Sequence, residues 1–264
     1  MTMQDMAVAI RDIAVTALPT PAVVVAAAVS ILAAALVRGF TGFGFALTAV
    51  PLLGLFMAPL QAVSIAVILQ LLIGVTDFRR ASRDSHWPSL RWLIVGGIAG
   101  SPVGALVLSV VPAPVARVLI AMITVGAVVA LNAGFRLATV PSRGVTGLVG
   151  LAAGLFNGLA AMPGPPVIVY YTSGPFSRIA ARASMMVFFL VSSIAALASV
   201  AMLGLLDVRA VVLTVLGIPM MLVGTWLGDI AFQRGSDMLH RRVSIASLAI
   251  VALGSAIKGL SDLL

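Results

Sequence analysis

Charged residues are scarce in this sequence. Only 9% of its 264 residues are Asp, Glu, Lys or Arg, 61% are apolar, and the mean hydropathy is +1.20. Soluble domains usually carry about 25% charged residues, because their surface faces water. A chain with so little charge cannot cover a globule of its size with polar groups, so its outer surface must face lipid. We therefore expect an all-α polytopic membrane protein, spanning a cell membrane of the cytoplasmic type many times.

Missing residue types exclude several kinds of chemistry. The chain has no cysteine, which excludes disulfides, thiolate zinc sites and iron–sulfur clusters. It also has no glutamate, and its two histidines, His86 and His240, lie in charged loops. Neither a P-loop nor a dinucleotide fingerprint is present. The sequence therefore predicts no enzyme, no cofactor, no metal site and no proton-relay carboxylate at the membrane centre.

The charge that is present is mostly basic, with a formal net charge of +8. In a soluble protein this excess would indicate a nucleic-acid partner. Here the arginines lie in short loops between apolar runs and form no stripe with interleaved aromatic residues, so we expect no nucleic-acid binding. Basic loops of this kind are typical of the positive-inside rule for membrane proteins.

Apolar runs of two lengths alternate along the chain. A helix needs about 20 residues to cross the hydrocarbon, and six runs meet that length: 59–78, 90–110, 113–132, 177–203, 209–228 and 241–260. Shorter runs come in pairs: 21–37 and 44–57 flank RGFTGFG, and 145–160 and 165–173 flank MPGPP. Glycine and proline interrupt helices, so each junction predicts a broken or re-entrant helix that faces protein or a wet cavity. The alternative is that these glycines serve only close helix packing.

The two pairs of short runs divide the chain into related halves. Gly39 and Pro51 recur as Gly154 and Pro166. The sequence thus predicts an N-terminal segment (1–20), a first membrane repeat (21–132), a linker (133–144) and a second membrane repeat (145–264). Each repeat contains one broken segment and three transmembrane helices. Residues 1–20 show no cleavage site after a basic region, so we expect a mature terminus and not a signal peptide.

Charge distinguishes two arrangements of the halves. If every segment crosses the membrane, the halves are parallel and the arginines divide almost evenly between the two sides. If segment 145–173 returns to the face from which it enters, the halves are inverted copies and most arginines lie on the cytoplasmic side. The positive-inside rule favours the inverted arrangement, which is common among secondary transporters.

The interruptions are the predicted substrate site. A helix start leaves backbone N–H groups unpaired and carries about half a positive charge, so two such starts near the midplane would attract an anion. Arg38 lies between an apolar stretch and the glycine cluster, where we expect either a substrate counter-ion or a side chain that reaches the lipid headgroups. Gln70 either faces the cavity or makes an interhelical hydrogen bond. The candidate substrate-binding residues are Arg38, Gly39, Thr41, Gly42, Gly44, Thr48, Gln70, Gly154, Asn157, Gly158, Pro163, Gly164 and Pro166.

Two segments resemble a known family. RGFTGFGFALTAVPLL (Arg38 to Leu53) and its partial echo GLFNGLAAMPGPPVIV (Gly154 to Val169) are similar to motifs of the sulfite exporter TauE/SafE family. The resemblance spans nearly the whole chain, in segment order and in the helix motifs at Gly104 and Gly224. It implies a two-halved permease that exports or takes up sulfite, sulfonates or other small organic anions. Family members usually carry more glycines in the second motif than this chain does at Ala160 to Pro166, which bears on the substrate more than on the fold.

Together these observations predict a secondary transporter, and in particular an exporter, of small anions such as sulfite, sulfonates or organic carboxylates. A passive anion pore and an uptake permease of the same class remain as alternatives. The expected partners are a small anion and the lipid bilayer, and a homodimer is one possible assembly.

Overall fold

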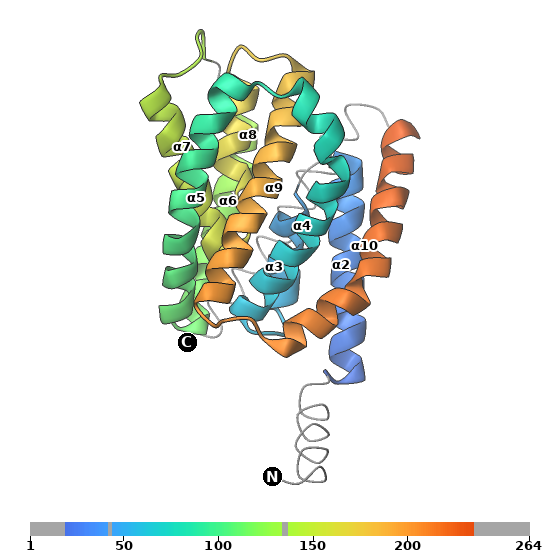
Figure 1. The fold of residues 1–264 in the computed structure, drawn as a ribbon. Coiled ribbons are helices and arrows are strands. Elements are labelled where there is room, and N and C mark those ends of the chain that lie inside the picture. Colours follow the sequence, from blue (N-terminus) through green and yellow to red (C-terminus); the bar gives the residue numbers. More distant parts are fainter. Residues whose placement is uncertain (1–18, 42–43, 134–136, 235–264) are drawn as a thin grey trace.

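The computed structural model describes residues 19–41, 44–133 and 137–234, and every regular element in these ranges is an α-helix. Figure 1 shows the arrangement of the helices. They are α2 (Pro21–Thr41), α3 (Phe45–Gly54), α4 (Pro59–Asp84), α5 (Trp87–Val110), α6 (Ala113–Ala133), α7 (Arg143–Ala160), α8 (Gly164–Ser173), α9 (Arg178–Met202) and α10 (Val208–Arg234).

Five of these helices are long and apolar enough to cross a membrane: Pro21–Phe40, Pro59–Thr76, Trp87–Val110, Ile179–Met202 and Val208–Ala231. This confirms the expected all-α membrane protein and four of the six predicted long runs. Helix α6, Ala113–Ala133, has 21 residues and covers the predicted run 113–132. The sixth predicted run, 241–260, lies outside the described residues.

The first interruption lies within the predicted RGFTGFG motif, at its C-terminal end. The sequence gives an apolar run that ends at Val37, but α2 continues through Arg38 and Gly39 to Thr41, so the prediction of a short first segment is wrong. One arginine does not stop a helix, because arginine is a good helix former and a cation in the last turn is favoured by the helix dipole. The break instead lies before Phe45, where Gly44 has a φ of 91° that glycine adopts without strain.

Contacts near the helix termini define two ends of the molecule. At one end the Tyr171 hydroxyl lies 3.1 Å from Ser89 Oγ, and the Tyr170 hydroxyl lies 3.0 Å from Thr146 Oγ1. These contacts join the end of α8 to the starts of α5 and α7, next to the arginine-rich end of α4. We call this the Arg79 end, at the top of Figure 1.

At the opposite end, which we call the Arg117 end, Arg117 Nε donates to the Gly54 carbonyl at 3.1 Å, and Gln61 Nε2 donates to Asp207 Oδ2. These bonds join the end of α3 to the start of α6, and the start of α4 to the start of α10. The α2–α3 hairpin therefore begins and ends at the Arg117 end, and the α7–α8 hairpin begins and ends at the Arg79 end (Figure 1).

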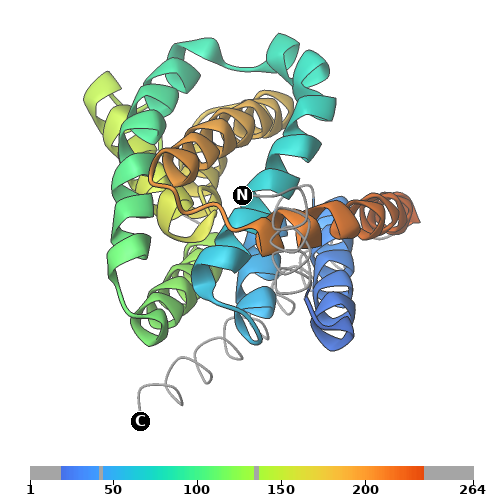
Figure 2. The same cartoon turned by 60° about the horizontal axis from the view of Figure 1, so that its bottom comes forward.

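Two pairs of parallel helices flank the centre of the molecule. Helix α5 packs along α7, and α2 packs along α10, so each pair takes one helix from each half of the chain. Figure 2 shows the two pairs on opposite sides, with α4 and α9 between them. Helices α4 and α9 run antiparallel, because Gln70 contacts Ser193 and Gly74 faces Leu190.

Glycines allow the flanking pairs to approach at backbone distance. The glycine seam between α5 and α7 consists of Gly96, Gly100, Gly104, Gly150, Gly154 and Gly158, spaced four residues apart on each helix. A methyl group at Gly154 would lie 2.9 Å from Gly97 Cα, and one at Gly100 would lie 2.8 Å from the Leu155 nitrogen. Lipid gives helices no hydrophobic drive to associate, so this close packing is what holds the pair together.

We expect Gly154→Ala to destabilise the protein by about 1–3 kcal/mol, because the added methyl group has no space in the seam. The measurement is the thermal unfolding midpoint of the purified protein in detergent. Gly147→Ala is the matched control on the same helix, since nothing lies within 4 Å of the methyl group added there. Equal midpoints for the two variants would contradict a packing role for Gly154.

Candidate functional site

The starts of α3 and α8 face one cavity in the middle of the molecule. Gly44, Phe45, Ala46 and Leu47 line it from α3, and residues 161–164 line it from the second interruption. Neither helix start has a side-chain cap. The first amide groups of a helix have no intrahelical acceptor, so both starts direct unpaired N–H groups and the positive end of a helix dipole toward the same space.

The two helix starts contribute unequally. Phe45, Ala46 and Leu47 each carry a backbone N–H in the first turn of α3. Helix α8 begins Gly164-Pro165-Pro166 after Pro163, and proline has no N–H, so Gly164 supplies the amide donor of that turn. The prolines fix the backbone of α8 in the helical region at the expense of donors. An anion in this cavity should therefore lie closer to α3 than to α8.

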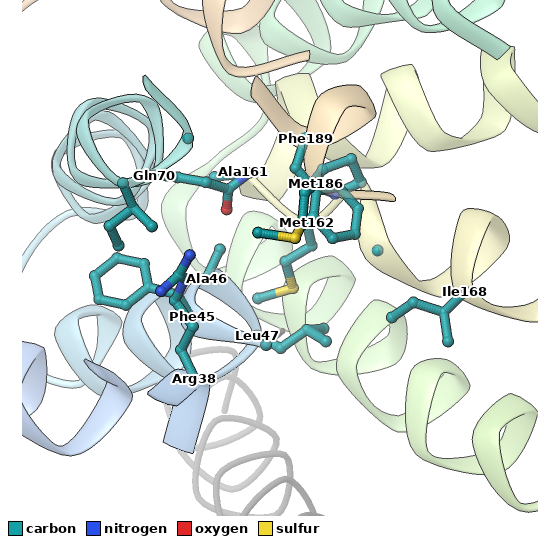
Figure 3. Close-up of a pocket in the computed structure, with 15 residues that line it drawn as sticks. Arg38, Phe45, Ala46, Leu47, Gln70, Ala161, Met162, Ile168, Met186 and Phe189 are labelled. Atoms are coloured by element: carbon teal, nitrogen blue, oxygen red, sulfur yellow. The ribbon is translucent and has the colours of Figure 1, made fainter. Parts of the chain in front are cut away.

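The cavity is small and mostly apolar. Its volume is about 50 Å³, and about 10–15 Å³ of such space is enough for one water molecule. Figure 3 shows Met162, Met186 and Phe189 around it, with the Arg38 side chain reaching into the same space. Apolar walls lower the local dielectric constant, so each hydrogen bond or charge in the cavity acts more strongly than it would in water.

Arg38 supplies the positive charge of the cavity. It lies in the last turn of α2, is partly buried, and lines the cavity. Its guanidinium carries five N–H donors and stays protonated at any physiological pH. A cation at the C-terminus of α2 is stabilised by the dipole of that helix, which offsets part of the cost of placing it among apolar side chains.

Gln70 lines the cavity from α4. Its Nε2 donates to Ser193 Oγ at 3.1 Å, and the Ser193 hydroxyl donates to the Phe189 carbonyl at 2.8 Å. Ser193 thereby holds the Gln70 amide in place across the α4–α9 contact. The amide group has two N–H donors, so one remains to face the cavity. Both roles expected from the sequence, the interhelical bond and the cavity lining, are thus combined in one side chain.

A known protein family matches this sequence. The model of the family described as sulfite exporter TauE/SafE matches residues 26–255. The chain belongs to this family. Its members are transporters and not enzymes, so the protein is a multi-pass membrane transporter.

Among individual proteins, a similar one is the probable sulfite/organosulfonate exporter TauE of Cupriavidus necator. It is 25% identical over 226 residues, which cover 82% of this chain and 86% of the relative. No solved structure matches the chain.

The structure brings together five of the residues that the sequence assigned to the site. Arg38, Gly44, Gln70, Pro163 and Gly164 all line the central cavity, although they come from α2, α4 and both interruptions. Two further candidates, Gly42 and the side chain of Thr41, lie outside the described residues.

Other candidates lie away from the cavity. Gly154 and Gly158 belong to the glycine seam with α5, and Gly39 packs against the α10 backbone at Thr225 and Gly228. Pro166 faces an apolar groove between α6, α7 and α8. Their glycine and proline motifs mark close packing and helix interruption, which the sequence pattern does not separate from ligand binding.

The polar candidates Thr48 and Asn157 are buried and do not line the cavity. Asn157 Nδ2 donates to the Ser192 carbonyl, and its Oδ1 has no partner among the described residues. The second N–H of the amide is not used by this bond, and the role of Asn157 as a donor to an anion remains a prediction. The Thr48 hydroxyl also lacks a partner among the described residues, and its role as a ligand remains a prediction.

Sequence reasoning missed the apolar lining of the cavity. Phe45, Ile73, Met186 and Phe189 come from α3, α4 and α9. Their spacing on these helices is that of ordinary core residues, so no signal in the sequence distinguishes them from the rest of the core.

We expect the first amide of α3 to contribute to anion binding, which a pair of substitutions at Phe45 tests. Phe45→Pro removes the N–H, and Phe45→Ala removes the same side chain but keeps the N–H. A hydrogen bond to a charged group contributes about 1.5–3 kcal/mol, so Phe45→Pro should bind sulfite about tenfold or more weakly than Phe45→Ala. The measurement is calorimetric titration of the purified proteins. Equal dissociation constants would remove this amide from the site.

Proposed function

We propose that this protein is a secondary transporter that exports small sulfur oxyanions, such as sulfite or organosulfonates, across the cell membrane. The observation that carries the proposal is the central cavity, in which two uncapped helix starts and Arg38 converge among apolar side chains. The protein has no nucleotide-binding motif, so a solute or ion gradient or the membrane potential would supply the free energy.

The donors of the cavity suit a sulfur oxyanion. Helix starts bind phosphate, sulfate and carboxylate groups through consecutive backbone N–H groups. Phe45, Ala46 and Leu47 present three such groups, and sulfite and sulfonates present three oxygen acceptors. A cavity of about 50 Å³ accommodates about three to five water-sized atoms, which is the size of sulfite or a one-carbon sulfonate.

The walls of the cavity favour a substrate with an apolar part. Met162, Met186 and Phe189 offer no hydrogen-bond donors to an anion. A methyl or methylene group beside the sulfonate gains by contacting them, since burial of one CH₂ contributes about 0.8 kcal/mol. The printed name of the Cupriavidus necator relative, which includes sulfite and organosulfonates, supports the same substrate class.

We also propose that the halves are inverted copies and that the Arg79 end is cytoplasmic. The α2–α3 and α7–α8 hairpins open toward opposite ends, and α4 and α9 run in opposite directions, as inverted repeats require. Among the described residues, Arg79, Arg80, Arg83, Arg91, Arg143 and Arg182 lie toward the Arg79 end, whereas Arg117 and Arg209 lie at the other. The positive-inside rule therefore favours a cytoplasmic Arg79 end.

Arg38→Gln should abolish most sulfite or methanesulfonate flux in proteoliposomes, because the cavity loses its positive charge. Arg79→Gln is the matched control, with the same loss of charge on an exposed residue that does not line the cavity. We expect at least a tenfold loss for Arg38→Gln and wild-type flux for Arg79→Gln. Unchanged flux in Arg38→Gln would remove Arg38 from the site, and conductance without saturation in the wild type would favour a pore over a carrier.

Single-cysteine labelling tests the orientation, and the absence of native cysteine makes the background clean. Ala138 lies in an exposed loop at the Arg79 end, and Met202 is 88% exposed at the end of α9 near the Arg117 end. In intact cells a membrane-impermeant maleimide should label Met202→Cys, and it should label Ala138→Cys only after permeabilisation. The reverse pattern would contradict the proposed orientation.

A further inference from the structure

Two further cavities adjoin the central one on the side of the Arg79 end. The nearer has a volume of about 550 Å³ and shares Arg38, Ile73 and Met186 with the central cavity. The outer has a volume of about 480 Å³ and shares Arg182, Met186 and Asp229 with the nearer one. We call the two together the vestibule. Its walls come from α2, α4, α9 and α10.

The vestibule follows one face of α4 from the central cavity to the end of that helix. Gln70 lines the central cavity, Thr76 lines the nearer part of the vestibule, and Asp84 lines the outer part. At 1.5 Å per residue, the distance from Gln70 to Asp84 is about 21 Å. The same order appears on α9, where Phe189, Met186 and Arg182 succeed one another toward the Arg79 end.

The other side of the central cavity is filled. The buried apolar cluster that includes Ile31, Val50, Leu69 and Leu213 occupies the space between α2, α3, α4 and α10 toward the Arg117 end. The contact between Gln61 and Asp207 joins α4 to α10 beyond it. In the part of the chain that the structure describes, the vestibule therefore extends from the central cavity toward the Arg79 end.

Charges are placed along the vestibule in a definite order. Arg80 and Asp84 lie at its mouth, Arg182 and Asp229 border both of its parts, and Arg38 lies at its inner limit. No carboxylate of the described residues is ion-paired with Arg182, so its charge is available to a solute. Seven residues of helix separate Arg182 from Phe189, a distance of about 10 Å, which is close to the Debye length of about 8 Å at physiological salt. An anion that moves inward beyond the electrostatic attraction of Arg182 is thus already close to the positive charge of the central cavity.

We infer that the vestibule is the route by which the substrate anion reaches the central cavity from the Arg79 end, and that Arg182 sets the charge selectivity of this route. Asp229 acts in the opposite sense, because its carboxylate repels the same anion and disfavours a second negative charge on it. The inference rests on the proposed function in one respect, that the solute is an anion. The substrate class that it defines is a monoanion in preference to a dianion.

Modification of a single cysteine in the vestibule tests the route without requiring transport. Thr76→Cys places a thiol on its α4 wall, and the rates of reaction with an anionic sulfonatoethyl and a cationic trimethylammonioethyl methanethiosulfonate are compared. We expect the ratio of the anionic to the cationic rate to fall about tenfold when Arg182→Gln is added, and to rise when Asp229→Asn is added. Arg79→Gln, the loss of an exposed arginine outside the vestibule, should leave the ratio unchanged.

A transport assay completes the test. Arg182→Gln should raise the KM for methanesulfonate severalfold at low ionic strength with little change in kcat, and the difference should shrink at high salt because exposed charges are screened. Asp229→Asn should improve transport of a dianionic sulfocarboxylate relative to methanesulfonate. A thiol at residue 76 that does not react, or a rate ratio that does not depend on Arg182, would overturn the inference even if the protein transports sulfite. A protein that transports no anion but shows the expected rate ratios would instead overturn the proposed function.

Discussion

The structure depends on one constraint, that backbone amide groups inside a membrane must find hydrogen-bond partners. A continuous helix satisfies them internally, whereas an interrupted helix leaves its first N–H groups unpaired. This protein interrupts two helices and encloses both interruptions within protein, between α4, α9 and the flanking helix pairs. The unpaired amides of α3 then have either water or a bound anion as partners, so a fold that tolerates the interruption also creates an affinity for negative charge.

Close helix packing makes this enclosure possible. The glycine seam brings the α5 and α7 backbones into direct contact, and Gly224 and Gly228 do the same for α10 against α2. In each pair one helix, α2 or α7, begins an interrupted hairpin. Its partner, α10 or α5, packs against it at backbone distance and holds it in place. The short backbone distance therefore requires glycine along the seam, while the side chains of α4 and α9 determine what the cavity holds.

The fold could be predicted from the sequence because hydropathy is averaged over a whole membrane helix, so no single residue changes the prediction much. Hydropathy predicts α4, α5, α9 and α10 within a few residues, and the MPGPP motif predicts the second interruption at the observed position. The end of α2 was predicted less well, since Arg38 ends an apolar run without ending a helix. A hydropathy pattern detects the environment of a side chain, whereas a helix ends where the backbone conformation changes.

The site was predictable only where residue type carries the chemistry. Arg38 and Gln70 stand out in apolar segments, and both line the cavity. In the sequence, Gly154 and Gly158 look the same as Gly44, yet in the structure they face α5. Glycine serves equally well in a turn, beside a ligand and against a neighbouring helix, so residue type alone does not distinguish these roles. Which use applies depends on the neighbour in space, and the neighbours of α7 lie some fifty residues earlier in the chain, on α5.

The pairing of α2 with α10 has a consequence for biosynthesis. Helix α2 leaves the ribosome before the other described helices, but its glycine-lined partner begins only at Val208, after the seven helices from α3 to α9 have been made. Until then the face of α2 that carries Ala35 and Gly39 must be covered by lipid or by another protein of the insertion machinery. A nascent chain that stops before α10 would leave this face uncovered, and such a truncated product should be recognised and degraded by membrane quality control.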